Sequence, residues 1–367
     1  MKGIKIYQRG QKEHIRIKPI EQQTINVTPA TTVINENYTQ SEVDAIVADI
    51  KQRYYYDIVG RNVTGEYYID EGTTKIGSGA FDYFQNVTKI VIPNSVTQMS
   101  GDGIFRWCHD LQSVVFPQNE SVTTIPNYCF SNCVRMTSID NFVFPSNIIS
   151  CGNYSFQGCS ALKTAIFPNN IKTIGNYAFQ NCSALTSVTM EGVTTLGNYC
   201  FDNCTKVTSF NLPNVTNIGD SCFYRTSALR SLALPNLKTL NQNAFRSTGL
   251  YSFVFPSTVT NLNLTGVFYE AKSLKTVDIP SGVTAIGGNF FYNCTALQTV
   301  IVRRTTPPTL NASAFRGVKT NGKIYVPYGC SAAYLASAAW ATSTGNYYPK
   351  KYGWTINELD ENGNIPT

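Results

Sequence analysis

Apolar residues recur at a regular interval between about residue 72 and residue 328. In the clearest copy, Leu162 to Phe179, an apolar segment, a Pro and a second apolar segment lead to a closing Phe. This period of 22 to 26 residues is typical of leucine-rich repeats, in which each unit stacks on the next. Eleven copies align on their closing aromatic residue, at Phe81, Phe105, Phe130, Phe156, Phe179, Phe201, Phe223, Phe245, Phe268, Phe291 and Phe315.

Each unit carries two strand signals. The first fits L-x-x-L-x-L, as at Leu185, Val188 and Met190, and a Pro that usually follows ends the strand because it lacks an N–H group. A second run with β-branched residues comes next, and Gly and Asn then turn the chain into the closing Phe. The pattern predicts a leucine-rich-repeat-like, β-rich solenoid of about eleven 22–26-residue repeats, with an N-terminal strand/helix segment and a C-terminal capping segment.

A longer motif, V-T-x-I-G-x-x-A-F-x-N-C-x-A-L, occurs with substitutions at Ile171 to Leu185 and again at Val283 to Leu297. In this motif the chain resembles the BspA-type leucine-rich repeats of bacterial surface proteins, over roughly 255 of its 367 residues. The resemblance implies a solenoid fold and a surface adhesin. It says less about function than about fold, because one fold hosts many functions.

We expect three regions: residues 1–60 as an anchoring arm and helix, 61–328 as the solenoid and 329–367 as a C-terminal cap. The first 18 residues carry +5 of the net charge of +6, from one Glu and six basic residues: Lys2, Lys5, Arg9, Lys12, Arg16 and Lys18. Alternation with Ile predicts one or two strands that dock on a partner protein. Nucleic acid binding and a plain solvated edge stay open as alternatives, although the near-neutral repeat array argues against a nucleic acid partner.

A helix is predicted after residue 38. Thr39 and Glu42 have the form of a capping box, and an apolar stripe follows at helical spacing: Val43, Ile46, Val47 and Ile50. Roughly four turns are too few for a stable isolated helix, so the stripe packs on the first repeat as a cap, or on another chain as an anchor or self-association helix. Neither a membrane span nor a secretory signal is expected from the sequence.

The C-terminal region predicts a strand over residues 323–327 and a short helix over residues 331–340. Tyr334, Leu335 and Trp340 are expected to form the apolar face of that helix and to cover the open end of the core. Residues after Tyr352 are read as a final strand or a loose tail.

The chain has eleven cysteines, and the repeat explains nearly all of them. Most lie three residues after, or one residue before, the closing Phe. We expect a column of buried thiols, with disulfides or a metal site as the alternatives. Asparagines two residues after the Phe, such as Asn181 and Asn203, are expected to bond the backbone of the turn.

Two columns predict exposed surface. One occupies the outward position of the first strand and includes Val115, Ile166, Thr189, Asn211, Val254 and Ile301. The other lies two residues before the closing Phe, with Tyr128, Tyr154, Tyr177 and Tyr199 in succession. These tyrosines either buttress the turns or form an aromatic contact strip for a protein or glycan.

No phosphate loop, G-x-S-x-G or H-E-x-x-H motif is present, so we expect no enzyme, cofactor or metal. The sequence favours a non-enzymatic adhesion module, anchored through its N-terminal segment to a protein of a larger assembly. That assembly is predicted to be a bacteriophage virion, with the solenoid presented as a fibre or decoration protein to a host-surface protein or glycan. A bacterial cell-surface or secreted adhesin of BspA type, an intracellular interaction scaffold and a homo-oligomer remain alternatives.

Overall fold

The computed structural model describes residues 5–8, 11–14, 63–341 and 348–366. The chain divides into two units, Met1–Tyr55 and Tyr56–Thr367. In the first unit β1 (Lys5–Gln8) and β2 (Gln11–His14) pair antiparallel, which places Lys5 and Lys12 in strands as predicted. The other predicted anchor residues lie outside the described residues: Lys2, Arg9, Arg16, Lys18, Val43, Ile46, Val47 and Ile50. The anchoring role of the whole set, Lys5 and Lys12 included, stays a prediction.

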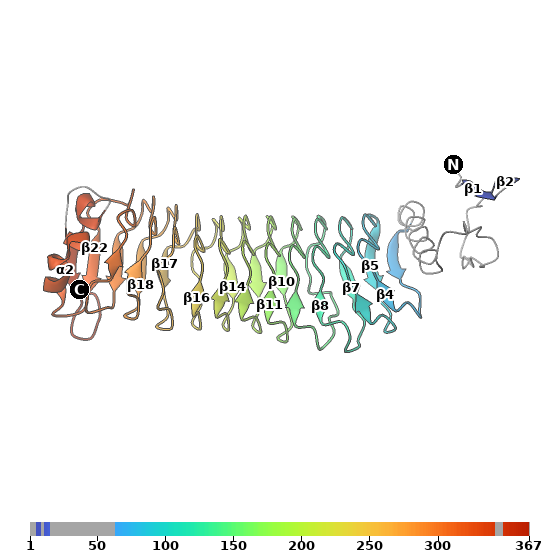
Figure 1. Ribbon diagram of the computed structural model, residues 1–367, viewed down its shortest axis with the longest axis horizontal. Helices are drawn as coiled ribbons and strands as arrows, with labels where there is room; N and C mark the ends of the chain where they lie inside the picture. The colour runs from blue at the N-terminus through green and yellow to red at the C-terminus, as the bar shows by residue number, and fades with distance from the viewer. Residues whose placement is uncertain (1–4, 9–10, 15–62, 342–347, 367) are drawn as a thin grey trace. The chain divides into compact units, whose positions relative to one another are not determined.

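The second unit is the predicted solenoid of about eleven turns (Figure 1). The first strands of successive repeats pair in parallel, and the repeats at residues 138–143 and 231–233, which lack this strand, divide the array into separate sheets. Three sheets result: β3 (Gly65–Tyr68), β5 (Val87–Val91) and β7 (Ser113–Val115); β10 (Thr164–Ile166), β12 (Ser187–Thr189) and β14 (Ser209–Asn211); β17 (Ser252–Val254), β18 (Thr276–Ile279), β20 (Thr299–Val302), β22 (Lys323–Val326) and β23 (Thr355–Glu358).

The second strands are only two residues long, and they also pair in parallel along the solenoid. They form three further sheets: β4 (Lys75–Ile76) and β6 (Gln98–Met99); β8 (Thr124–Ile125), β9 (Ser150–Cys151), β11 (Thr173–Ile174), β13 (Thr195–Leu196), β15 (Asn217–Ile218) and β16 (Thr239–Leu240); β19 (Ala285–Ile286) and β21 (Thr309–Leu310).

The first-strand sheet is interrupted in the fourth repeat. Its extra residues form a turn at Asp140 and Asn141, where neighbouring repeats have a strand. Parallel bridges on either side, Val115 to Val143 and Ser138 to Thr164, keep the stack in register across the insertion.

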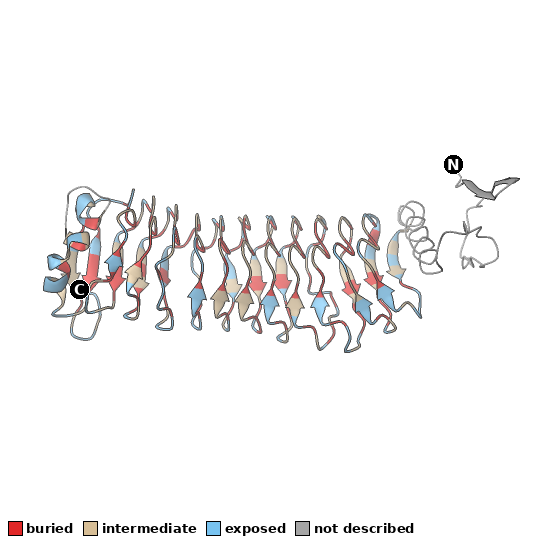
Figure 2. Cartoon of the chain, viewed as in Figure 1, coloured by how far each residue is buried: buried red, intermediate tan, exposed pale blue. Residues whose placement is uncertain are grey.

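The core is a continuous stack of the closing phenylalanines. From Phe81 to Phe291 successive ring centroids lie 5.1 to 6.0 Å apart with interplanar angles of 24° or less. Ten of the eleven closing Phe side chains are fully buried, and Phe81 at the N-terminal end is nearly so. Burial therefore alternates along the coil between core-facing and outward residues (Figure 2). Each buried ring removes a large apolar area from water.

The cysteine column is buried, as predicted. Ten cysteines are buried, and Cys330 beyond the repeats is partly exposed. The thiol three residues after the closing Phe donates to the carbonyl of the closing Phe in the repeat before it. Examples are Cys182 Sγ to Phe156 O at 3.2 Å and Cys204 Sγ to Phe179 O at 3.1 Å. Burial raises the pKa of these thiols, to about 12 for Cys159, because the core cannot solvate a thiolate.

The C-terminal segment closes the open end of the core. It consists of β22, α2 (Ser331–Ala336), α3 (Ala338–Ala341), η3 (Pro349–Tyr352) and β23. Tyr334 and Trp340 are buried as predicted, and Trp340 Nε1 donates to Pro308 O at 2.9 Å. The prediction for Leu335 is wrong, since its side chain is 57% exposed. Successive helical residues point about 100° apart, so Leu335 cannot share the inward direction of Tyr334. Within the described residues, no helix combines the length and the apolarity that a bilayer crossing needs.

Candidate binding surface

The four predicted tyrosines form a single stack along the solenoid, the tyrosine strip. Ring centroids lie 4.6 Å apart for Tyr128 and Tyr154, then 4.7 Å to Tyr177 and 4.9 Å to Tyr199, with interplanar angles of 2° to 3°. All four side chains are half-buried. Because the ring faces cover one another, the strip presents ring edges and hydroxyl groups to the outside.

Each tyrosine of the strip has a left-handed backbone, with φ between 53° and 56°. Side chains with a Cβ pay roughly 1–2 kcal/mol for this conformation, whereas Gly and Asn adopt it routinely. Six other repeats indeed place a small residue at the same position with positive φ: Gly79, Gly103, Ser221, Asn243, Gly266 and Asn289. The strip therefore places four bulky tyrosine side chains at a position where other repeats have Gly, Ser or Asn.

An asparagine ladder holds the backbone just before each tyrosine. Asn153 N donates to Asn127 Oδ1 at 2.8 Å, Asn176 N to Asn153 Oδ1 at 2.7 Å and Asn198 N to Asn176 Oδ1 at 2.7 Å. The ladder was predicted two residues after the Phe. At that position Asn203 Nδ2 instead donates to Asn181 Oδ1 within its own column, and these residues serve the second left-handed turn position.

A polar ladder runs beside the strip, one residue after the closing Phe. Gln157 Nε2 donates to Gln180 Oε1 and Gln180 Nε2 to Asp202 Oδ2, both at 2.8 Å. Asp202 is only 6% exposed, and its Oδ1 has no hydrogen-bond partner among the described residues. Burial raises the pKa of this carboxyl group, and the Gln180 hydrogen bond and the Arg225 charge partly offset the rise.

The same column holds residues that the sequence analysis missed. From the seventh repeat onward it carries a tyrosine–arginine ladder: Tyr224, Arg246, Tyr269, Tyr292 and Arg316. The Arg246 guanidinium lies 5.1 Å from the Tyr224 ring centroid and 4.5 Å from that of Tyr269. Tyr269 and Tyr292 stack at 4.4 Å. The repeat alignment shows these residues directly after the closing Phe, in the order Tyr, Arg, Tyr, Tyr, Arg, but it does not show their contacts with one another.

The strip and the ladder are neighbours across one β-turn. In each repeat the amide one residue after the Phe donates to the carbonyl two residues before it, for example Gln180 N to Tyr177 O at 3.1 Å and Tyr269 N to Gly266 O at 2.9 Å. A Cβ placed on Gly266 would lie 3.4 Å from the Cβ of Tyr269. The strip ends at Tyr199 in the sixth repeat, and the ladder begins at Tyr224 in the seventh. We call the strip and the ladder together the aromatic ridge.

The predicted outward column on the first strands is only partly exposed. Ile166 and Val254 are 50% and 67% exposed, but they lie four repeats apart. Between them stand Thr189, Asn211 and Ala233, so no continuous apolar patch forms. The half-buried Val115 is separated from Ile166 by the insertion at Asp140.

Ile301 is the exception in this column, because it is only 7% exposed rather than outward and accessible. It packs with Tyr325 and with Leu359 of the C-terminal segment. Arg303 Nη1 donates to Gly363 O at 2.5 Å on the same segment. The chain thus covers its own sheet face at this end.

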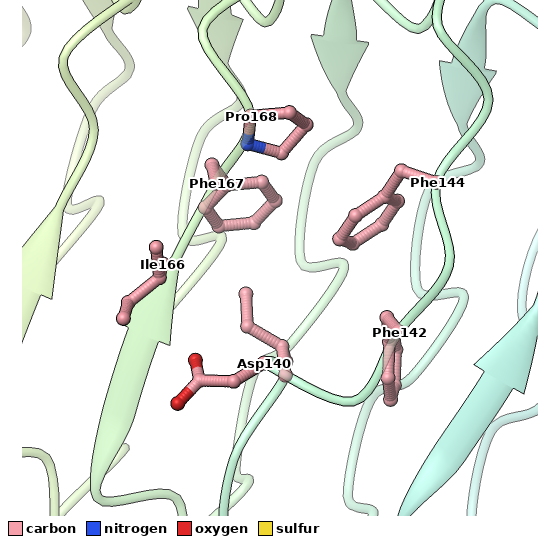
Figure 3. A pocket seen from close by; sticks show the side chains of 7 residues that line it. Asp140, Phe142, Phe144, Ile166, Phe167 and Pro168 are labelled. Carbon is pink, nitrogen blue, oxygen red and sulfur yellow. The ribbon is translucent and has the colours of Figure 1, made fainter.

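A hollow of about 290 Å³ opens in the sheet face beside the insertion (Figure 3). Phe142 and Phe144 line one side, and Ile166, Phe167 and Pro168 line the other. The ring of Phe144 stacks between those of Phe116 and Phe167, at 5.4 and 5.8 Å. The extra residues at Asp140 therefore leave a hollow in the sheet face, while the aromatic core beneath stays continuous.

The fold defines the class of protein, a leucine-rich-repeat solenoid. The chain belongs to the BspA type leucine-rich repeat family, whose six-copy model matches residues 49–141, 74–206, 135–249 and 238–339. Among solved structures it is similar to a leucine-rich repeat protein from Bacteroides ovatus, with 25% identity, coverage of 80% of this chain and 83% of that one, and a TM-score of 0.57.

A leucine-rich repeat protein from Eubacterium ventriosum aligns over 87% of both chains with 22% identity and a TM-score of 0.44. No curated protein matches the chain.

Proposed function

We propose that this chain is a non-enzymatic binding module that holds a protein partner along the aromatic ridge. One observation carries the proposal: four successive tyrosines keep a left-handed backbone that Gly, Ser or Asn occupies in other repeats. Residues held in a left-handed backbone conformation at a cost in free energy cluster at functional sites.

The composition of the ridge favours a protein partner. Tyr and Arg dominate the energetics of protein interfaces, where they bury much surface at low entropic cost. Here stacking and cation–π contacts already fix the side chains, for example Arg246 between Tyr224 and Tyr269, so little freedom is lost on binding. A sugar would need open ring faces, and in the strip neighbouring rings cover those faces.

The test compares two double variants of the full chain. Tyr154→Asn/Tyr177→Asn removes two rings of the strip and leaves a residue that tolerates the backbone conformation. Tyr251→Asn/Tyr328→Asn makes the same chemical change at two exposed tyrosines outside the ridge. Each immobilised protein is used to capture proteins from extracts of the native source, with quantification by mass spectrometry.

We expect at least one captured protein to fall about tenfold or more with the ridge variant and to stay unchanged with the control. Equal capture by the unaltered chain and both variants, or an equal loss of capture in both variants, would refute the aromatic ridge as the binding surface. Loss of capture after enzymatic deglycosylation of the extract would replace the protein partner by a glycan.

We infer in addition that residues 1–60 anchor the module in a larger assembly, for which we propose a bacteriophage virion and, as the alternative, a bacterial cell surface. This part rests on the basic arm with its charge of +5 and on a composition unlike that of the repeats. Sedimentation of the source lysate on a density gradient tests it. Co-migration with virus-sized particles supports the virion, recovery with the envelope supports the cell surface, and a free pool contradicts both.

A further inference from the structure

A polar trough of about 420 Å³ lies in the loops that lead into the second strands, at repeat positions other than those of the aromatic ridge. It crosses four consecutive repeats where the chain enters the second strands β11, β13, β15 and β16. Its lining side chains are Lys172, Thr194, Asn214, Thr216, Asn236 and Lys238.

The trough is open because of one glycine. The turn position held by Asn214 and Asn236 in two of these repeats is Gly192 in the repeat before them. A Cβ on Gly192 would lie 1.9 Å from Asn169 O, so no larger residue fits without moving the backbone. The close stacking of the turns thus forces a gap in the row of asparagine side chains.

Both ends of the trough carry a positive charge. Lys172 and Lys238 directly precede residues that are three paired strands apart, which corresponds to a Cα separation of roughly 14 Å at the usual strand spacing. Lys172 Nζ donates to the carbonyls of Asn169 and Gly192, at 2.9 and 3.3 Å. Among the described residues, neither lysine forms an ion pair, and Lys238 Nζ has no hydrogen-bond partner.

The middle of the trough offers hydroxyl and amide groups. Thr194 Oγ1 and Thr216 Oγ1 donate to the carbonyls of the preceding repeat, at 3.2 Å each, and keep their oxygen lone pairs as acceptors. Asn214 Nδ2 donates to Glu191 O at 2.8 Å, and its Oδ1 and second N–H stay available. The Glu191 carboxylate is turned to the sheet face, where it accepts from Asn211 Nδ2 at 3.0 Å.

We propose that this trough binds a linear acidic polysaccharide, one that carries carboxylates or sulfates on alternate sugars. The two lysines take two anionic groups, and the threonines and asparagines between them bond the hydroxyls of the intervening sugars. A polysaccharide fits better than an acidic peptide, because the four side chains between the lysines carry hydroxyl or amide groups that both donate to and accept from sugar hydroxyls. The site is independent of the ridge, so either proposal can fail alone.

The binding test uses hexasaccharides of hyaluronan and of chondroitin sulfate, which place anions on alternate sugars, with calorimetry on the full chain. Lys172→Gln/Lys238→Gln removes both trough charges. Lys163→Gln/Lys206→Gln is the matched control, because it removes two exposed lysines from the same repeats outside the trough. Thermal unfolding of each variant checks the fold, and Lys238→Gln alone removes no described hydrogen bond.

We expect one of the two hexasaccharides to bind the unaltered chain, and more weakly as the salt concentration rises. The trough variant weakens binding at least about tenfold, Lys238→Gln several-fold, and the control less than about twofold. Lys172→Arg/Lys238→Arg keeps most of the affinity. Failure of both hexasaccharides to bind overturns the proposal, and so does equal weakening by the trough and control variants. Equal binding of a hexaglutamate peptide with the same variant pattern overturns the polysaccharide assignment.

Discussion

Two aromatic columns run through this solenoid with the same period and with stacked rings in both, but they differ in burial and in backbone conformation. The phenylalanine stack is buried and forms the core. The tyrosine strip, two residues earlier in the chain, is half-buried and strained in its backbone. The sequence period therefore identifies a column of equivalent residues. Burial and backbone conformation then distinguish a column that forms the core from one that can serve as a binding surface.

The interior should be far more sensitive to pH than the exterior. Nine of the buried thiols have a pKa raised by burial, among them Cys151 and Cys159 to about 12. A thiol with a raised pKa stabilises the fold fully below its unfolded pKa. That contribution is lost as pH rises through the range between the unfolded and the folded pKa.

We expect the free energy of unfolding to fall above about pH 9 by up to about 1.4 kcal/mol per pH unit and per thiol, enough for nine thiols to unfold the chain. Urea unfolding at a series of pH values measures it. Cys182→Ala should reduce the slope of the unfolding free energy against pH, above pH 9, by the contribution of one thiol. The ninth repeat has Ala271 at the corresponding position, so the fold accepts Ala there. A stability that stays level to pH 11 would contradict the buried-thiol column.

The next largest effect is expected from the phenylalanine stack. Phe179→Ala removes a fully buried ring that stacks on Phe156 at 5.3 Å and on Phe201 at 5.5 Å. Truncation of such a side chain costs about 3–5 kcal/mol, because the cavity collapses only partly. Denaturant unfolding measures the loss. A change under about 1 kcal/mol would mean that the neighbouring turns close over the gap.

The repeat register made the core predictable from sequence. Phe179 and Cys182 recur at fixed offsets, and only a stacked coil places such residues on one line. The short second strands followed from the same register. The left-handed tyrosine position was also signalled, since Gly79 and Asn243 hold it in other repeats and are the residues that positive φ favours.

Features that depend on contacts between different columns were not predictable in this way. The tyrosine–arginine ladder continues the strip only because the residues two before and one after the Phe meet across a β-turn. Ile301 is covered by Leu359, which lies far along the chain in the C-terminal segment. The trough exists because Gly192 contacts the backbone of the preceding repeat. Each needs a distance through space that the period alone does not supply.

The smallest expected effect decides most about function. Tyr177→Asn removes a ring with stacking contacts worth about 0.5–1.5 kcal/mol on each side, but it also relieves a backbone strain of roughly 1–2 kcal/mol. We therefore expect the free energy of unfolding to change by less than about 1 kcal/mol, in contrast to Phe179→Ala two residues away. Denaturant unfolding of both variants in parallel makes the comparison. A loss of about 2 kcal/mol or more would show that the strip buttresses the turns, and the strain would no longer favour a binding role.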